Sequence, residues 1–202
     1  MTYYGCALRE VETKLQVLND EFKLGHDRNP IESIKSRIKS VESIAKKLEK
    51  KGITLNADSM EENIARIENS IFDIAGIRVI CAFPEDIYRL AKQLTSQDDI
   101  TLVREKDYIS SPKPNGYRSL HLIVEIPVFF STGKRPMKVE VQFRTIAMDF
   151  WASLEHKMKY KKNIRNQDYI ADELLKCSRI ISETDYRMQE IRWLIESADS
   201  AE

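Results

Sequence analysis

Two carboxylates stand in segments that are otherwise typical of buried strands. Asp73 opens residues 72–83, an almost wholly apolar run, and Glu140 lies in residues 138–144, where polar and apolar side chains alternate. Burying a charge is costly unless the charge is paired or liganded. Two carboxylates brought together are a standard way to hold Mg²⁺, which prefers oxygen ligands and substrate phosphates. The pattern therefore favours a magnesium site on a sheet, held by Asp73 and Glu140.

A plainer interpretation of both carboxylates remains open from the sequence. Asp73 and Arg78 interrupt the same run, so they could pair with each other. Glu140 has Lys138 and Arg144 on the same face of its predicted strand, because side chains two residues apart share a face. In that case the charges would be structural.

The loop that begins at Lys106 offers groups that could hold a nucleotide. Gly116 gives its backbone freedom to bend. Its cations could neutralise phosphate oxygens and its rings could stack on a base; these residues are Lys106, Lys113, Arg118, Tyr108 and Tyr117. His121, on the following strand, could donate a hydrogen bond to a phosphate, or it could pack in the core. The alternative for the loop is an ordinary turn with solvated lysines.

A further basic group precedes the first carboxylate. Asn29-Pro30 predicts the start of a helix that ends at Gly52, with Asn29 as N-cap. Its buried stripe would be Ile31, Ile34, Ile38, Val41, Ala45 and Leu48. On the opposite face Lys39, Ser43 and Lys47 lie four apart, with Arg37 near the edge of the stripe. A solvated basic face is the alternative interpretation.

The elements that would position these groups form an α/β (α+β) domain. Strands are expected in residues 72–83, near 100–103 and on either side of the turn 131–134, and helices in residues 84–96 and 145–161. The last two strands form a hairpin, so we predict a mixed sheet of about four to five strands flanked by helices. The apolar face of the helix 145–161 should be Ile146, Phe150, Trp151, Leu154 and Met158.

Both ends of the chain predict long amphipathic helices. Apolar residues recur at alternating steps of four and three in residues 3–24. The helix 169–198 has a heptad-like seam: Ile170, Leu174, Cys177, Ile181, Met188, Ile191 and Ile195. Two such seams suggest that the end helices pack together or against another subunit.

Composition excludes several classes of function. The chain has 202 residues with 32 basic and 32 acidic side chains, so its net charge is zero and any basic site must be local. Apolar runs fall short of the roughly 20 residues of a membrane span, and we expect a cytoplasmic protein. The sequence contains no GxxxxGK[ST] phosphate loop and no GxGxxG fingerprint. A phosphate-handling site would have to use side-chain cations on a sheet together with Mg²⁺.

Three ordered segments carry a specific resemblance. DIAGIRVICAF, KDYISSPKPNGYRSLHLIV and VEVQFRTIAMDFWASLEH resemble the synthetase domain of the RelA/SpoT family. The likeness extends over residues 29–161, and the short chain is similar to the small alarmone synthetases, most of all the RelP branch. We therefore expect an N-terminal packing or oligomerisation helix (1–28), a nucleotidyltransferase-like synthetase domain (29–161) and a C-terminal packing helix (162–202).

The resemblance implies a pyrophosphokinase with a role for each polar residue. The β,γ-pyrophosphate of ATP would pass to the ribose 3′-hydroxyl of GTP or GDP, giving AMP and pppGpp or ppGpp. Asp73 would ligate Mg²⁺, and Glu140 would be general base or second metal contact. ATP would be held by Arg37, Lys39, Ser43, Lys47 and Arg78. The acceptor would meet Lys106, Lys113, Tyr117, His121, Gln142 and Asp149, with Tyr117 stacking on guanine and Asp149, where relatives have Asn, reading its edge.

Two other functions remain possible at this stage. The chain could be a catalytically weak nucleotide- or RNA-binding module of the same fold, although both metal carboxylates are intact. It could also be another nucleotidyltransferase that releases pyrophosphate; AMP as product separates the two reactions. The resemblance implies a homotetramer and no need for nucleic acid or a membrane, while GDP or GTP preference is open.

Overall fold

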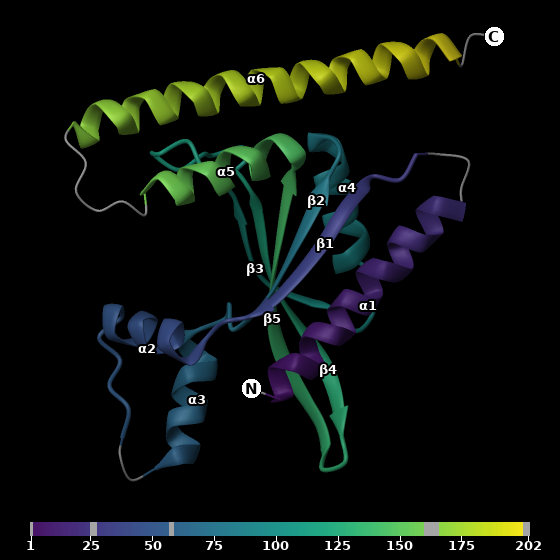
Figure 1. The fold of residues 1–202 in the computed structure, drawn as a ribbon. Helices are drawn as coiled ribbons and strands as arrows, with labels where there is room; N and C mark the ends of the chain where they lie inside the picture. Colours follow the sequence, from purple (N-terminus) through teal and green to yellow (C-terminus); the bar gives the residue numbers. More distant parts are fainter. Residues whose placement is uncertain (1, 25–27, 57–58, 160–165, 200–202) are drawn as a thin grey trace.

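A five-stranded mixed sheet forms the centre of the molecule (Figure 1). The computed structural model describes residues 2–24, 28–56, 59–159 and 166–199. The strand order is β1-β2-β5-β4-β3, in which the β2–β5 pair is parallel and the other pairs are antiparallel. The strands are β1 (Ile31–Ile38), β2 (Ala75–Cys81), β3 (Thr101–Asp107), β4 (Leu120–Phe130) and β5 (Gly133–Thr145). The predicted fold class and the predicted hairpin are confirmed.

Alternation along the strands separates an apolar face from a polar one. Val139, Val141 and Phe143 of β5 are fully buried, and they belong to one core with residues of α1 (Thr2–Leu24) and α4 (Pro84–Thr95). The intervening residues of β5 face the other way. Two short helices, α2 (Val41–Lys50) and α3 (Met60–Ser70), lie together beside the sheet (Figure 1).

The prediction of one helix from Asn29 to Gly52 is wrong in its first part. Ile31–Ile38 is strand β1, paired antiparallel with β2, and α2 begins only after the N-cap Ser40. The register shifts between Ile31 and Ser33, and such a bulge breaks strict alternation. Apolar residues three and four apart can therefore face one core from a strand, which imitates helical spacing.

The predicted apolar stripe of that helix changes accordingly. Leu48 is buried, but Val41 is 68% exposed and Ala45 is also exposed. Ile44 and Leu48 are the α2 residues that pack towards Ile71 and Ile74. Leu48 was therefore predicted correctly, whereas Val41 and Ala45 lie on the exposed side of α2.

The buried faces of the last two helices also differ from the prediction. In α5 (Ile146–Lys159), Met148, Trp151 and Ala152 are buried, whereas Ile146 and Phe150 are more than half exposed. In α6 (Gln167–Asp199) the buried polar side chains are Ser178, Asp185 and Gln189. The apolar residues Met188, Ile191 and Ile195 are exposed. The helix docks through polar groups, so an apolar seam could not identify its inner face.

Helices α1 and α6 lie on different sides of the molecule (Figure 1). Helix α1 packs on the sheet, and α6 runs across α5 and α4. The prediction that the two end helices pack together is therefore wrong. Packing of either helix against another subunit stays a prediction.

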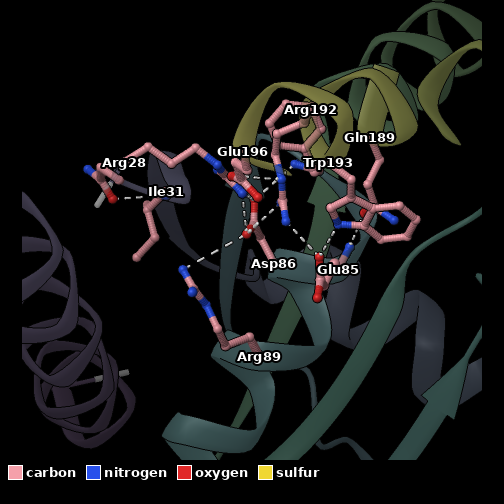
Figure 2. A network of polar contacts seen from close by, with 11 residues as sticks. Arg28, Ile31, Glu85, Asp86, Arg89, Gln189, Arg192, Trp193 and Glu196 are labelled. Carbon is pink, nitrogen blue, oxygen red and sulfur yellow. Dashed lines mark hydrogen bonds and ion pairs between the residues drawn. The ribbon is translucent and has the colours of Figure 1, made fainter. Parts of the chain in front are cut away.

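Polar contacts attach the C-terminal half of α6 to the start of α4 (Figure 2). The backbone N–H of Glu85 donates to Gln189 Oε1 at 2.7 Å. The Glu85 carboxylate accepts from Arg192 Nη2 at 2.8 Å and from Trp193 Nε1 at 3.0 Å. These bonds hold α6 along the top of the domain. None of the helices in the described part of the chain is long and apolar enough to cross a membrane.

Candidate active site

Pairing across the sheet places the predicted site residues in two rows on the polar face. Residues directly opposite each other on paired strands share a face. One row, from β1 to β3, is Lys35, Arg78, Gln142, His121 and Lys106. The next row is Arg37, Gly76, Glu140, Ile123 and Arg104. Strand register alone therefore gathers residues that are up to about a hundred positions apart in sequence.

Two adjoining hollows lie over these rows. The larger, of about 820 Å³, reaches from α2 to the loop after β3 and is lined by Lys47, Lys106 and Lys113 among others. The smaller, of about 180 Å³, lies over β1 and β2 and is lined by Lys35 and Arg78. Both hollows are lined by Arg37, Asp73, Glu140 and Gln142. The two carboxylates thus stand where the hollows meet.

Asp73 is ionised and held by two lysines. It precedes β2, and its Oδ2 accepts from Lys39 Nζ at 2.5 Å and from Lys47 Nζ at 2.6 Å. Burial raises the pKa of Asp73, but the hydrogen bonds and charges of the two lysines outweigh burial, so the pKa is lowered. Pairing between Asp73 and Arg78, the alternative from the sequence, is wrong.

Glu140 lies at the centre of the sheet and is also ionised. Its Oε1 lies 3.2 Å from His121 Nδ1, and its Oε2 accepts from Gln142 Nε2 at 2.8 Å. Burial raises the pKa of Glu140, but these two partners outweigh burial and lower it. Lys138 turns instead to Glu125, at 3.8 Å. The alternative of a structural pair between Glu140 and Lys138 is wrong.

The carboxylates fit a Mg²⁺ ion that is completed by substrate oxygens. Asp73 Oδ1 is buried and has no hydrogen-bond partner among the described residues, so one carboxylate oxygen is left for a ligand. The charge of Asp73 raises the pKa of Glu140, which shows that the two groups repel each other. Within the described ranges no cluster of three or more His, Cys, Asp or Glu side chains could hold a metal. Mg²⁺ commonly binds with few protein carboxylates plus phosphates.

Aromatic rings gather at the larger hollow: Tyr108 and His121 line it, whereas Tyr117, which contacts both of these rings, lines neither hollow. Tyr117 packs edge-on against Tyr108 and His121, with ring centroids 6.1 and 5.8 Å away. Lys113 Nζ lies 4.5 Å from the ring centroid of Tyr108 and 4.6 Å from that of Tyr117. The Tyr117 hydroxyl is 2.8 Å from His121 Nε2. His121 therefore bridges Glu140 and the Tyr117 hydroxyl through its two ring nitrogens.

The buried Arg144, which the sequence suggested only as a possible partner of Glu140, joins Tyr117 to Asp149. Arg144 Nη2 donates to the Tyr117 hydroxyl at 2.6 Å, and Arg144 Nη1 donates to Asp149 Oδ1 at 2.9 Å. The same Asp149 oxygen accepts from Arg78 Nη1 at 3.2 Å. Asp149 lines neither hollow, and its carboxylate is occupied by two arginines. Its role as a guanine reader stays a prediction.

Lys39, Ser43 and Lys47, which were predicted to share one face of a helix, do not share one element in the structure. Lys39 lies before α2 and Lys47 on it, yet both reach Asp73. Ser43 is exposed in the first turn of α2, where its hydroxyl accepts from Ser40 Oγ at 2.9 Å. The structure therefore gathers the two lysines at the carboxylate and leaves Ser43 outside both hollows.

Two residues that line the larger hollow, and the buried Arg144, were not assigned to the site although their spacing could have revealed them. Lys51 follows Lys47 by four residues, which is one helical turn, and Arg104 precedes Lys106 by two on the same strand. Arg144 follows Gln142 by two on β5. Continuing the helical step of four and the strand step of two by one more residue would have identified all three.

The chain belongs to the RelA/SpoT family. The family model described as "Region found in RelA / SpoT proteins" matches residues 36–165. This part of the chain carries strands β2 to β5, the residues that line the larger hollow and both carboxylates.

Named relatives extend the likeness to almost the whole chain. The chain is 46% identical to the GTP pyrophosphokinase YwaC of Bacillus subtilis over 189 residues, which cover 94% of this chain and 87% of the relative. Its structure is similar to that of small alarmone synthetase 1 from B. subtilis bound to its product pppGpp, with a TM-score of 0.84, 35% identity and coverage of 95% and 94%. Small alarmone synthetase 2 from B. subtilis matches with a TM-score of 0.80, 44% identity and 95% coverage of each chain.

Proposed function

We propose that this chain is a GTP pyrophosphokinase that makes (p)ppGpp for the stringent response. It transfers the β,γ-pyrophosphate of ATP to the ribose 3′-hydroxyl of GTP or GDP. The observation that carries the proposal is the pair of hollows that meet at Asp73 and Glu140. A transfer between two nucleotides needs two sites with charged groups at their boundary, and the named relatives have this activity.

The reaction asks for positioning and charge neutralisation more than covalent chemistry. The acceptor 3′-oxygen forms a bond to the β-phosphorus of ATP, the bond between that phosphorus and the α,β-bridging oxygen breaks, and AMP leaves with that oxygen. Glu140 takes the proton of the 3′-hydroxyl. His121 and Gln142 hold the two carboxylate oxygens, which fixes the direction in which Glu140 accepts.

The remaining site residues bind the two nucleotides, one set for ATP and one for the acceptor. Arg37 and Arg78 hold the adenine end of ATP, while its phosphates meet the two cations Lys39 and Lys47 and the hydroxyl of Ser43. Tyr117 stacks on guanine, and the acceptor is oriented by Lys106, Lys113, His121, Gln142 and Asp149. Asp73 and Glu140 would hold Mg²⁺, which would neutralise charge on the transferred phosphates.

Product analysis tests this function. The purified chain is incubated with ATP, Mg²⁺ and either GDP or GTP, and the nucleotides are separated by anion exchange, with Glu140→Gln as control. We expect AMP in equal amount to a guanosine nucleotide that bears two extra phosphates. Release of pyrophosphate would indicate another nucleotidyltransferase reaction. Absence of AMP while both nucleotides bind would leave the binding module.

We also propose a homotetramer that works in the cytoplasm. Exposed apolar side chains on α6, including Met188, Ile191, Leu194 and Ile195, support an interface there, because apolar groups gathered on one helix favour burial. The three-part division at residues 28/29 and 161/162 belongs to the same proposal; the second boundary lies outside the described residues. Light scattering coupled to size exclusion measures the mass, and a monomer at micromolar concentration would contradict the tetramer.

A further inference from the structure

The loop that carries Tyr117 is closed by a turn with a buried glycine. Gly116 N donates to Lys113 O at 2.8 Å, and Lys113 N donates to Tyr117 O at 3.2 Å. Gly116 has φ +88°, a conformation that side-chain-bearing residues rarely adopt. The position of the Tyr117 ring therefore depends on how this turn is held.

Helix α6 presses directly on that turn. A Cβ atom added to Gly116 would lie 2.6 Å from Ser178 Cβ and 3.2 Å from Leu175 Cδ1, both on α6. Ser178 is buried, and its hydroxyl donates to Gly116 O at 2.5 Å. Arg118 Nη1 approaches the same hydroxyl at 3.4 Å. One serine thus contacts residues on both sides of Tyr117 in the chain.

Ser178 is itself fixed from both directions along α6. On one side, Trp151 Nε1 of α5 donates to Leu174 O at 2.9 Å. On the other, Thr145 Oγ1 donates to the buried Asp185 at 2.6 Å. These bonds attach α6 to β5 and α5, so the position of Ser178 relative to the sheet is fixed.

We infer that Ser178 is a positioning residue for the acceptor nucleotide. Its hydroxyl holds the Gly116 carbonyl, and the turn then presents the Tyr117 ring to the guanine base. The inference rests on the proposed function, because it uses Tyr117 as the guanine platform. Helix α6 begins at Gln167, beyond the matched residues 36–165, so a segment outside the family region would complete the acceptor site.

Binding measurements on Ser178→Ala test the inference separately from turnover. The change removes one hydroxyl and leaves the Gly116 carbonyl buried without that donor, for which we expect about tenfold weaker binding of GDP and GTP. Affinity for a non-hydrolysable ATP analogue should change by less than about twofold. Ser197→Ala is the matched control, because it removes a hydroxyl of the same helix that donates to its own helix at Trp193 O.

Each outcome decides one claim. Unchanged GDP affinity in Ser178→Ala would overturn the positioning role. Equal losses for GDP and the ATP analogue would make Ser178 a general packing residue and would also overturn it. A wild-type chain that binds no guanine nucleotide would contradict the proposed function itself. A KM for GDP that rises while kcat and the KM for ATP hold would support the inference in the working enzyme.

Discussion

Replacing Glu140 by Gln separates its chemical role from its structural one. The substitution keeps the size of the side chain, but both Glu140 oxygens face nitrogen donors, on His121 and Gln142. The NH₂ group of the introduced glutamine must therefore face one of these two donors. Rearranging the hydrogen bond to His121 or Gln142 costs about 1 kcal/mol, which corresponds to roughly a fivefold change in a dissociation constant. Loss of the proton acceptor costs far more, about 4 kcal/mol or a thousandfold in kcat.

The assay is steady-state AMP formation with ATP and GDP, together with the affinity of each nucleotide. We expect kcat to fall about a thousandfold, while both dissociation constants stay within roughly fivefold. Glu125→Gln is the control: it makes the same change on β4, at a residue that pairs with Lys138 away from both hollows. Turnover close to that of the wild type in Glu140→Gln would remove Glu140 from the mechanism.

Three further predictions concern the acceptor, the metal and α6. Tyr117→Ala should weaken guanine-nucleotide binding about tenfold, since stacking on a base contributes about 1–3 kcal/mol, and calorimetry should show almost unchanged binding of an ATP analogue. Asp73→Asn should raise the Mg²⁺ concentration for half-maximal turnover about tenfold, measured by titrating the metal into chelator-treated enzyme. Burial raises the pKa of Asp185 to about 6, so folding favours its protonated form and the contribution of Asp185 to stability falls as pH rises from about 4 to 6. Asp185→Asn should remove that slope and raise stability at pH 7 by about 2–3 kcal/mol, measured by urea unfolding across pH.

Other results would contradict each of them. Equal losses of guanine and adenine nucleotide affinity in Tyr117→Ala would refute the stacking assignment. An unchanged metal requirement in Asp73→Asn would place Mg²⁺ elsewhere. The same pH dependence of stability between pH 4 and 6 in the wild type and in Asp185→Asn would show that the Asp185 carboxyl is not perturbed by its burial.

Patterns with one dominant physical cause were predictable from the sequence. The alternation in residues 138–144 is confirmed as β5, because one face of that strand packs in the core and the other faces the hollows. The apolar run before Pro84 is confirmed as the internal strand β2. Asp73 and Glu140 were named because a charge in such a segment needs a partner, and the structure places both at the junction of the hollows.

Features that depend on tertiary contacts were not predictable in the same way. Ile31 and Ile34 have helical spacing, but their segment is a strand because it pairs with β2 and contains a bulge. The inner face of α6 is polar because Asp185 meets Thr145 and Ser178 meets Gly116, contacts that no periodicity reveals. The partners of Asp73 come from residues 26 and 34 positions away.

The fate of the β-phosphorus of ATP tests the central claim most directly. The chain is supplied with ATP labelled at the β-phosphate, Mg²⁺ and GDP, and the products are separated by anion exchange. If the diphosphoryl group moves as a unit, all transferred label appears in the guanosine product, with one unlabelled AMP for each. Label recovered as ADP or as free pyrophosphate would contradict the account, because the bond broken or the acceptor would then be a different one.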